Sequence, residues 1–207
     1  MKWLCSRALN TSTGGVRLLV PPSPTSPGFW IGSASEVKIA AKKYITQVDL
    51  SDLEGAINFD GMYWPEFPLV KSLDLTPLMN VRGATNFLRG FMGLELVDLT
   101  PLGNLKGTGV LFMNQCSSLK HIDTRPLVSL VSCHDDFMYD CSSLETVNLG
   151  GLSRANAIGS HFLGRCSSLR HLDCSGLENI TYISHSFMAG CTKLETINPY
   201  ICKNKAR

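Results

Sequence analysis

Hydrophobic residues recur along this chain with a period of 25 residues. A phenylalanine appears five times at this spacing, at Phe87, Phe112, Phe137, Phe162 and Phe187. Four residues after each phenylalanine comes either Phe91 or a cysteine, and three residues further comes a leucine. Columns that stay in phase over five repeats indicate a solenoid, in which each unit buries its apolar side only by stacking on the next unit.

Each repeat contains a short stretch in which apolar and polar residues alternate, as in a strand with one buried face. The stretch reads as an apolar residue, then Asp or Asn, then usually leucine. The sequence predicts such strand cores at residues 48–50, 73–75, 97–99, 122–124, 147–149, 172–174 and 197–199. The spacing is 25 except for 24 between the second and third, where a residue is missing between Val81 and Phe87. We therefore expect about six to seven turns, with parallel strands stacked about 4.8 Å apart.

The remainder of each repeat predicts two further elements. A weaker apolar pair, such as Ile180 with Ile183 or Leu130 with Cys133, indicates a second, shorter strand. The F-[LM]-x-x-C-S-S segment follows it, and we expect this segment to form a short helical turn that leads back to the next main strand.

The segment from Leu177 to Leu194 is similar to the BspA-type leucine-rich repeat, whose usual frame is L-x-x-I-x-I-P-x-S-V-T-x-I-G-x-x-A-F-x-x-C-x-x-L. It matches that frame at the I-T-x-I step, at F-x-x-x-C-x-x-L and at the strand, and the resemblance covers about residues 45–202. The unit here is slightly longer, and Asp-Leu replaces the usual Ile-Pro at the strand end. The resemblance implies a right-handed solenoid of parallel β structure, in a family of mostly non-enzymatic surface or adhesion proteins of bacteria and protozoa.

The two ends of the chain fall outside the repeat. Pro21–Gly28 has the composition of an extended or disordered linker. Ser33-Ala-Ser-Glu36 is typical of a capping box and predicts a helix to about Tyr44 that closes the first turn. No such cap follows the last turn, which leaves it open to a partner or to a second copy of the chain. The predicted segments are a disordered leader, a capping helix, a solenoid and a basic tail, at residues 1–32, 33–47, 45–202 and 203–207.

Charge and composition exclude some classes of partner and leave the compartment open. The chain has 19 basic and 17 acidic residues, which gives no electrostatic case for nucleic acid. Its apolar stretches are shorter than the roughly 18–20 residues of a membrane-spanning helix. The leader has no acidic residue before Glu36, as in an organelle transit peptide, whereas the family resemblance favours the cell surface. Reduced thiols and the lack of a continuous apolar signal core favour an intracellular protein.

The eight cysteines are predicted to be buried, reduced thiols. Cys116, Cys141, Cys166 and Cys191 share one column with Phe91, and a position that accepts either phenylalanine or cysteine is a hydrophobic position. Side chains stacked in parallel are poorly placed to form disulfides, and a spacing of 25 is unlike that of zinc ligands. We therefore expect neither a disulfide framework nor a metal site.

One edge of the solenoid carries the only grouping that resembles a catalytic or metal centre. Asp136 and His161 share a column one repeat apart, with Asp135 and His185 close in phase. A metal or Ser-His-Asp site needs a third convergent group and a pocket, and the sequence indicates neither. We interpret these residues as solvated polar side chains, and a metal-dependent enzyme at this edge is the remote alternative.

The outward side of the strands is the stronger candidate for a binding surface. Its central column is acidic or amide throughout, and two interpretations remain open. In the structural interpretation, each Asp accepts hydrogen bonds from the residues that follow it. In the functional interpretation, the column forms an acidic concave face that binds a basic or polar peptide. The candidate residues on this face are Leu96, Asp98, Thr100, His121, Asp123, Arg125, Thr146, Asn148, His171, Asp173 and Ser175.

These patterns favour a non-catalytic protein-interaction module without a cofactor, because a rigid stacked sheet lets outward side chains vary while the core columns stay fixed. An exported surface or adhesion antigen is the alternative that the family resemblance supports. The sequence does not identify the protein partner.

Overall fold

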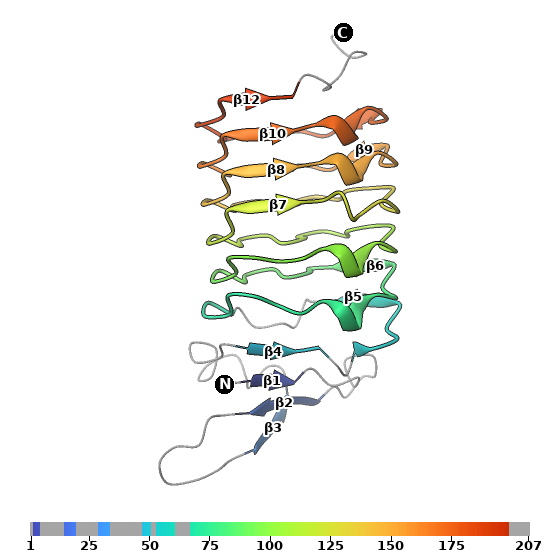
Figure 1. Ribbon diagram of the computed structural model, residues 1–207, viewed down its shortest axis with the longest axis vertical. Helices are drawn as coiled ribbons and strands as arrows, with labels where there is room; N and C mark the ends of the chain where they lie inside the picture. Colours follow the sequence, from blue (N-terminus) through green and yellow to red (C-terminus); the bar gives the residue numbers. More distant parts are fainter. Residues whose placement is uncertain are drawn as a thin grey trace.

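The computed structural model describes residues 2–4, 15–19, 29–33, 47–50, 53–60 and 67–198. Its parallel strands are stacked as a β-solenoid of about five turns with little helix (Figure 1). The stacked parallel architecture predicted from the period is thereby confirmed, with about five turns where the sequence predicts six to seven. Below, one turn is called a rung, and residues at equivalent positions in successive rungs form a column.

The main strands form one face of the solenoid. They are β7 (His121–Asp123), β8 (Thr146–Asn148), β10 (His171–Asp173) and β12 (Thr196–Ile197), paired in the order β12-β10-β8-β7. Ile122 pairs with Val147, which pairs with Leu172, which pairs with Ile197, so the register equals the sequence period. The strand cores predicted at these positions are confirmed. The strand cores predicted at residues 73–75 and 97–99 are not assigned as strands, although backbone hydrogen bonds still join these two rungs, with Glu95 N donating to Lys71 O at 2.9 Å.

A second ladder of short strands confirms the weaker strand expected in each repeat. It contains β5 (Asn58–Asp60), β6 (Gly83–Thr85), β9 (Ala157–Ile158) and β11 (Tyr182–Ile183). Single bridges join Gly83 to Gly107 and Gly107 to Ser132 between them. Gly83 and Gly107 are 24 positions apart, whereas the next equivalent pair, Asn86 and Leu111, is 25 apart. The missing residue of that rung is therefore located between Gly83 and Asn86.

The segment that leads back to the main strand is not the short helical turn that the sequence predicts. Alternate residues take positive φ, for example Leu111 (60°), Met113 (53°) and Gln115 (62°). Their N–H groups bond to other rungs: Leu111 N donates to Asp135 O at 3.0 Å, and Met113 N donates to Phe87 O at 2.6 Å. A helical turn keeps its hydrogen bonds inside the segment, so the prediction is wrong and the segment forms a third ladder between rungs.

Short 3-10 turns follow β8 and β10, and also follow the equivalent residues 73–75 and 97–99 of two earlier rungs. They are η4 (Thr76–Leu78), η5 (Thr100–Leu102), η6 (Gly150–Leu152) and η7 (Ser175–Leu177). Each buries the leucine at its end. In the part of the chain that the structure describes, helices are too short or too polar to cross a bilayer.

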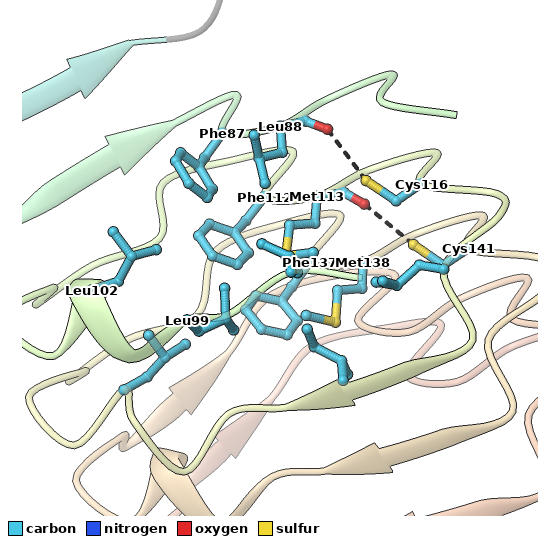
Figure 2. Close-up of a cluster of buried hydrophobic side chains, with 14 of the residues drawn as sticks. Phe87, Leu88, Leu99, Leu102, Phe112, Met113, Cys116, Phe137, Met138 and Cys141 are labelled. Atoms are coloured by element: carbon cyan, nitrogen blue, oxygen red, sulfur yellow. Dashed lines mark hydrogen bonds between the residues drawn. The ribbon is translucent and has the colours of Figure 1, made fainter. Parts of the chain in front are cut away.

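The core is a stack of like side chains (Figure 2). Phe112 lies between Phe87 and Phe137, with ring centroids 5.1 and 5.2 Å away, and Phe137 lies 4.8 Å from Phe162. All four rings are 0% exposed. The interplanar angles of 22°, 5° and 5° give a nearly parallel stack, which fixes the rungs in register through packing as well as through backbone hydrogen bonds.

In the N-terminal region, four strands form one sheet. Strands β1 (Lys2–Leu4), β2 (Gly15–Leu19) and β3 (Phe29–Ser33) pair with β4 (Gln47–Asp49), in the order β3-β2-β1-β4. β1 pairs in parallel with β4, which is the first main strand. The predicted capping helix lies almost entirely outside the described residues, as does the basic tail.

Candidate functional site

A groove of about 690 Å³ opens on the face of the main strands. Most of the candidate residues line it, whereas Asp98, Thr100 and Ser175 lie outside its lining. The groove also includes residues of the last rung, which the sequence analysis left out although the period itself places them in the same columns. The lining residues are Leu96, Val97, His121, Ile122, Asp123, Arg125, Thr146, Val147, Asn148, His171, Leu172, Asp173, Thr196, Ile197 and Asn198.

The Asp/Asn column along the groove has a structural role. Asp98 Oδ1 accepts a hydrogen bond from Thr100 N at 2.8 Å, and Asn148 Oδ1 accepts one from Gly150 N at 2.8 Å. Asp173 Oδ1 likewise accepts a hydrogen bond from Ser175 N at 3.0 Å, and Asp74 Oδ1 accepts one from Thr76 N at 2.9 Å. Each side chain thus closes the turn that follows its strand. The hydrogen bonds of the structural interpretation are therefore present. They do not remove the negative charge of the aspartates, which can still attract a ligand.

Asp123 differs from its column neighbours because it also forms an ion pair. Arg125 donates to both of its carboxylate oxygens, with an NH2–Oδ2 distance of 2.6 Å. The hydrogen bond from Arg125 lowers the pKa of Asp123, and the Asp123 carboxylate raises the pKa of Arg125. A Cβ on Gly150 would lie 3.2 Å from Arg125 Cγ, so this glycine provides room for the arginine side chain over the next rung.

On the other side of the groove, histidine and threonine alternate. His121 Nδ1 lies 2.8 Å from Thr146 Oγ1, and His171 Nδ1 lies 2.8 Å from Thr196 Oγ1. A hydrogen bond to Nδ1 fixes the orientation of each ring and leaves Nε2 as its other polar atom. The two imidazoles therefore present the same group twice, two rungs apart.

One end of the groove is apolar. Leu96 is 67% exposed and lies in the outward column that His121, Thr146 and His171 occupy in the following rungs, so its side chain can contact a ligand. Ile197, at the last described rung, belongs to the inward column of the buried Ile122, Val147 and Leu172.

The edge cluster contains two separate pairs. His161 Nδ1 lies 3.3 Å from Asp136 Oδ1, and its ring contacts that of His185 edge to face with centroids 5.2 Å apart. His185 Nδ1 instead lies 3.3 Å from Ser160 Oγ, and Asp135 Oδ1 accepts a hydrogen bond from Ser160 N at 2.7 Å. Within the described ranges, groups of three or more His, Cys, Asp or Glu side chains that could hold a metal ion are absent.

The cysteine column has a hydrogen-bonding role in the core. Cys116 Sγ donates to Leu88 O at 3.3 Å, and Cys141 Sγ donates to Met113 O at 3.2 Å (Figure 2). The acceptors are carbonyls of positive-φ residues in the preceding rung. Burial raises the pKa of Cys166, and the hydrogen bond with Cys116 followed by burial raises that of Cys141. Thiols held protonated are poor nucleophiles and metal ligands, so we regard this column as structural.

Comparisons of the chain with protein-family models, with curated proteins and with solved structures find no match.

Proposed function

We propose that this protein is a non-catalytic interaction module of the leucine-rich-repeat type, which binds a polypeptide in the groove on its strand face. The observation that carries the proposal is that the groove lies over a face whose outward side chains form polar columns across successive rungs. The inward leucines at 94, 119, 144 and 169 are fully buried, as the repeat type requires.

A stacked sheet is suited to this role because its side chains are held by a rigid framework. The backbone groups of the floor are already paired in the ladder, so a ligand meets side chains and not free strand edges. Preformed surfaces of this kind bind without a large cost of ordering. The exposed Leu96 adds apolar contact at one end.

The test selects peptides from a random display library with the immobilised wild-type protein and measures the dissociation constants of the selected peptides by fluorescence anisotropy. The variant D98N/D173N removes two carboxylates from the face and keeps the side-chain oxygen that closes each turn, as Asn148 does in the same column. We expect this variant to bind basic peptides about tenfold more weakly.

The matched control is D140N/E178Q, which removes two carboxylates that neither line the groove nor belong to the strand column of Asp98 and Asp173. It should bind the selected peptides as the wild type does. Equal losses in both double variants would show that only the net charge matters, and unchanged binding in D98N/D173N would contradict the assignment of the strand face.

A further inference from the structure

The groove is elongated along the solenoid axis. Its lining residues come from five successive rungs, from Leu96 to Asn198, but only from three consecutive strand positions together with Arg125. With rungs about 4.8 Å apart and residues about 3.3 Å apart along a strand, the groove is about 19 Å long and about 7 Å wide. A ligand that fills it therefore crosses the strands and runs from rung to rung.

The side chains along the groove repeat every two rungs and not every rung. One column reads His121, Thr146, His171, Thr196, and the column opposite reads Asp, Asn, Asp, Asn. The column beside the histidines alternates in charge, as Lys71, Glu95, Lys120, Glu145, Arg170, Glu195.

The contacts in these columns follow the same two-rung unit. Lys71 Nζ lies 2.9 Å from Glu95 Oε1, and Arg170 forms an ion pair with Glu195. Asn198 Nδ2 donates to Asp173 Oδ1 at 3.1 Å. These contacts and the two His–Thr contacts all join the first rung of a pair to the second. The groove thus presents equivalent groups about 9.6 Å apart, which is twice the rung spacing.

This period matches one extended backbone better than others. A polyproline II helix has three residues per turn and a rise of about 3.1 Å per residue, so it repeats about every 9.3 Å. A β-strand repeats on one side about every 6.6–6.8 Å. An α-helix is about 10–12 Å across with its side chains, which is wider than the groove.

The charge of the groove indicates which side chains the ligand carries. Asp123 is neutralised by Arg125, whereas Asp98 and Asp173 accept hydrogen bonds from neutral groups. Hydrogen bonds from Thr100 lower the pKa of Asp98, so this carboxyl group is ionised at neutral pH. Within the lining, the carboxylates of Asp123 and Asp173 and the guanidinium of Arg125 leave one negative charge in excess, and Asp98 adds a carboxylate on the same strand face beyond the lining. This excess of negative charge attracts a basic ligand.

We propose, on the basis of the proposed function, that the groove binds a polypeptide in the polyproline II conformation, lying along the solenoid axis with a basic residue at every third position. Successive turns of the ligand meet two His/Asp rungs, at His121 with Asp123, whose carboxylate also binds Arg125, and at His171 with Asp173. The free Nε2 atoms of the histidines face backbone carbonyls of the ligand, which this conformation leaves without internal hydrogen bonds.

The test measures the affinity of the full chain for labelled peptides of equal length by fluorescence anisotropy. A Lys-Pro-Pro repeat has the proposed conformation and period. A peptide of the same composition with its lysines clustered keeps the charge and the proline content but loses the period. A Lys-Gly-Gly repeat keeps the spacing and the charge but is flexible. A Glu-Pro-Pro repeat reverses the charge.

We expect the Lys-Pro-Pro repeat to bind about tenfold more tightly than the clustered and the glycine peptides, and the Glu-Pro-Pro repeat to bind most weakly. The variant H121T/H171T, which extends the native threonines of that column, should lose this preference. His134→Thr, a change of the same kind outside the groove, should keep it.

Equal affinity for the three lysine peptides, or no measurable binding of any of them, would overturn this inference. These outcomes would leave the proposed peptide-binding function standing. Library-selected peptides that bind the groove without a three-residue period would support that function and would refute the polyproline II ligand.

Discussion

Thr124 occupies a core position that leucine fills in the neighbouring rungs, at Leu99 and Leu149. It is 0% exposed, and its hydroxyl has no hydrogen-bond partner within the described residues. An unsatisfied hydroxyl in an apolar environment costs about 1–3 kcal/mol. Thr108 is equally buried, but its hydroxyl donates to Gly109 O at 3.1 Å and accepts from His134 N at 3.3 Å.

We therefore expect Thr124→Val to raise the free energy of unfolding by about 1 kcal/mol. Thr108→Val should lower it, because it removes both hydrogen bonds. Denaturant titration followed by circular dichroism measures both changes. A destabilised Thr124→Val variant would show that its hydroxyl has a partner after all.

The buried thiols make stability depend on alkaline pH. Burial raises the pKa of Cys133 to about 12 in the folded protein, from about 9.0 for an exposed thiol. The unfolded chain therefore loses this proton first, and the contribution of Cys133 to stability is complete below pH 9 and is lost as the pH rises towards 12. The loss is about 1.4 kcal/mol per pH unit in this range.

Cys133→Val removes this ionisable group and keeps an apolar side chain in the core. The free energy of unfolding of this variant should fall less steeply above pH 9 than that of the wild type, with the two curves parallel below pH 8. Denaturant titrations at several pH values measure the difference. Parallel curves at all pH values would contradict the burial of this thiol.

At the scale of elements, the third ladder depends on residues at positive φ. Gln115 (62°) shares a column with Gly90 (74°) and Gly190 (87°), in which glycine adopts this conformation without strain. A non-glycine residue there costs about 1–2 kcal/mol, and the extra flexibility of glycine in the unfolded chain offsets about half of that.

Gln115→Gly should therefore raise the free energy of unfolding by about 0.5–1 kcal/mol, and the reciprocal Gly90→Ala should lower it by about 1 kcal/mol. Thermal and chemical denaturation of the two variants provide the measurement. If Gln115→Gly were destabilising, the segment would not have the positive-φ backbone described above.

The main strands were predictable because alternation along a strand and a period along the chain are both local properties of the sequence. The third ladder was not, because phenylalanine followed four residues later by cysteine has the spacing of a buried helix face. Only the hydrogen bonds to neighbouring rungs, such as Met113 N to Phe87 O, separate the two conformations. The pairing of β1 with β4 is likewise non-local, and composition alone cannot reveal it.

The sequence period predicts which columns of residues line the candidate site, but it does not predict the contacts between their side chains. The period located the groove residues from Leu96 to Asp173, and it could also have located Thr196 and Asn198. The ion pair between Arg125 and Asp123 depends on the space above Gly150, which appears only when the rungs are stacked.

At the scale of the whole molecule, each rung contacts its neighbours through the same columns, so stability is close to a sum over rungs. Excision of residues 121–145 removes one full period and brings Phe112 next to Phe162 in the stack. This variant should retain a single cooperative unfolding transition at a lower denaturant concentration than the wild type.

Excision of residues 121–144 is the matched control, because it leaves one extra residue in the strand and shifts its side chains towards the opposite face. It should unfold at a clearly lower denaturant concentration than the full-period excision. Equal midpoints for the two excisions would mean that the rungs are not stacked in the register described here.

The central claim is that the strand face is the ligand-binding surface of this solenoid. The most direct test is to map, by nuclear magnetic resonance, the backbone amides whose chemical shifts change when the Lys-Pro-Pro peptide or a library-selected peptide is added. We predict that the shifts concentrate on β7, β8, β10 and β12, around His121, Thr146 and His171, and leave the second ladder around His134 and Tyr182 unchanged. Shifts centred on the second ladder, or on the edge around His161, would contradict it.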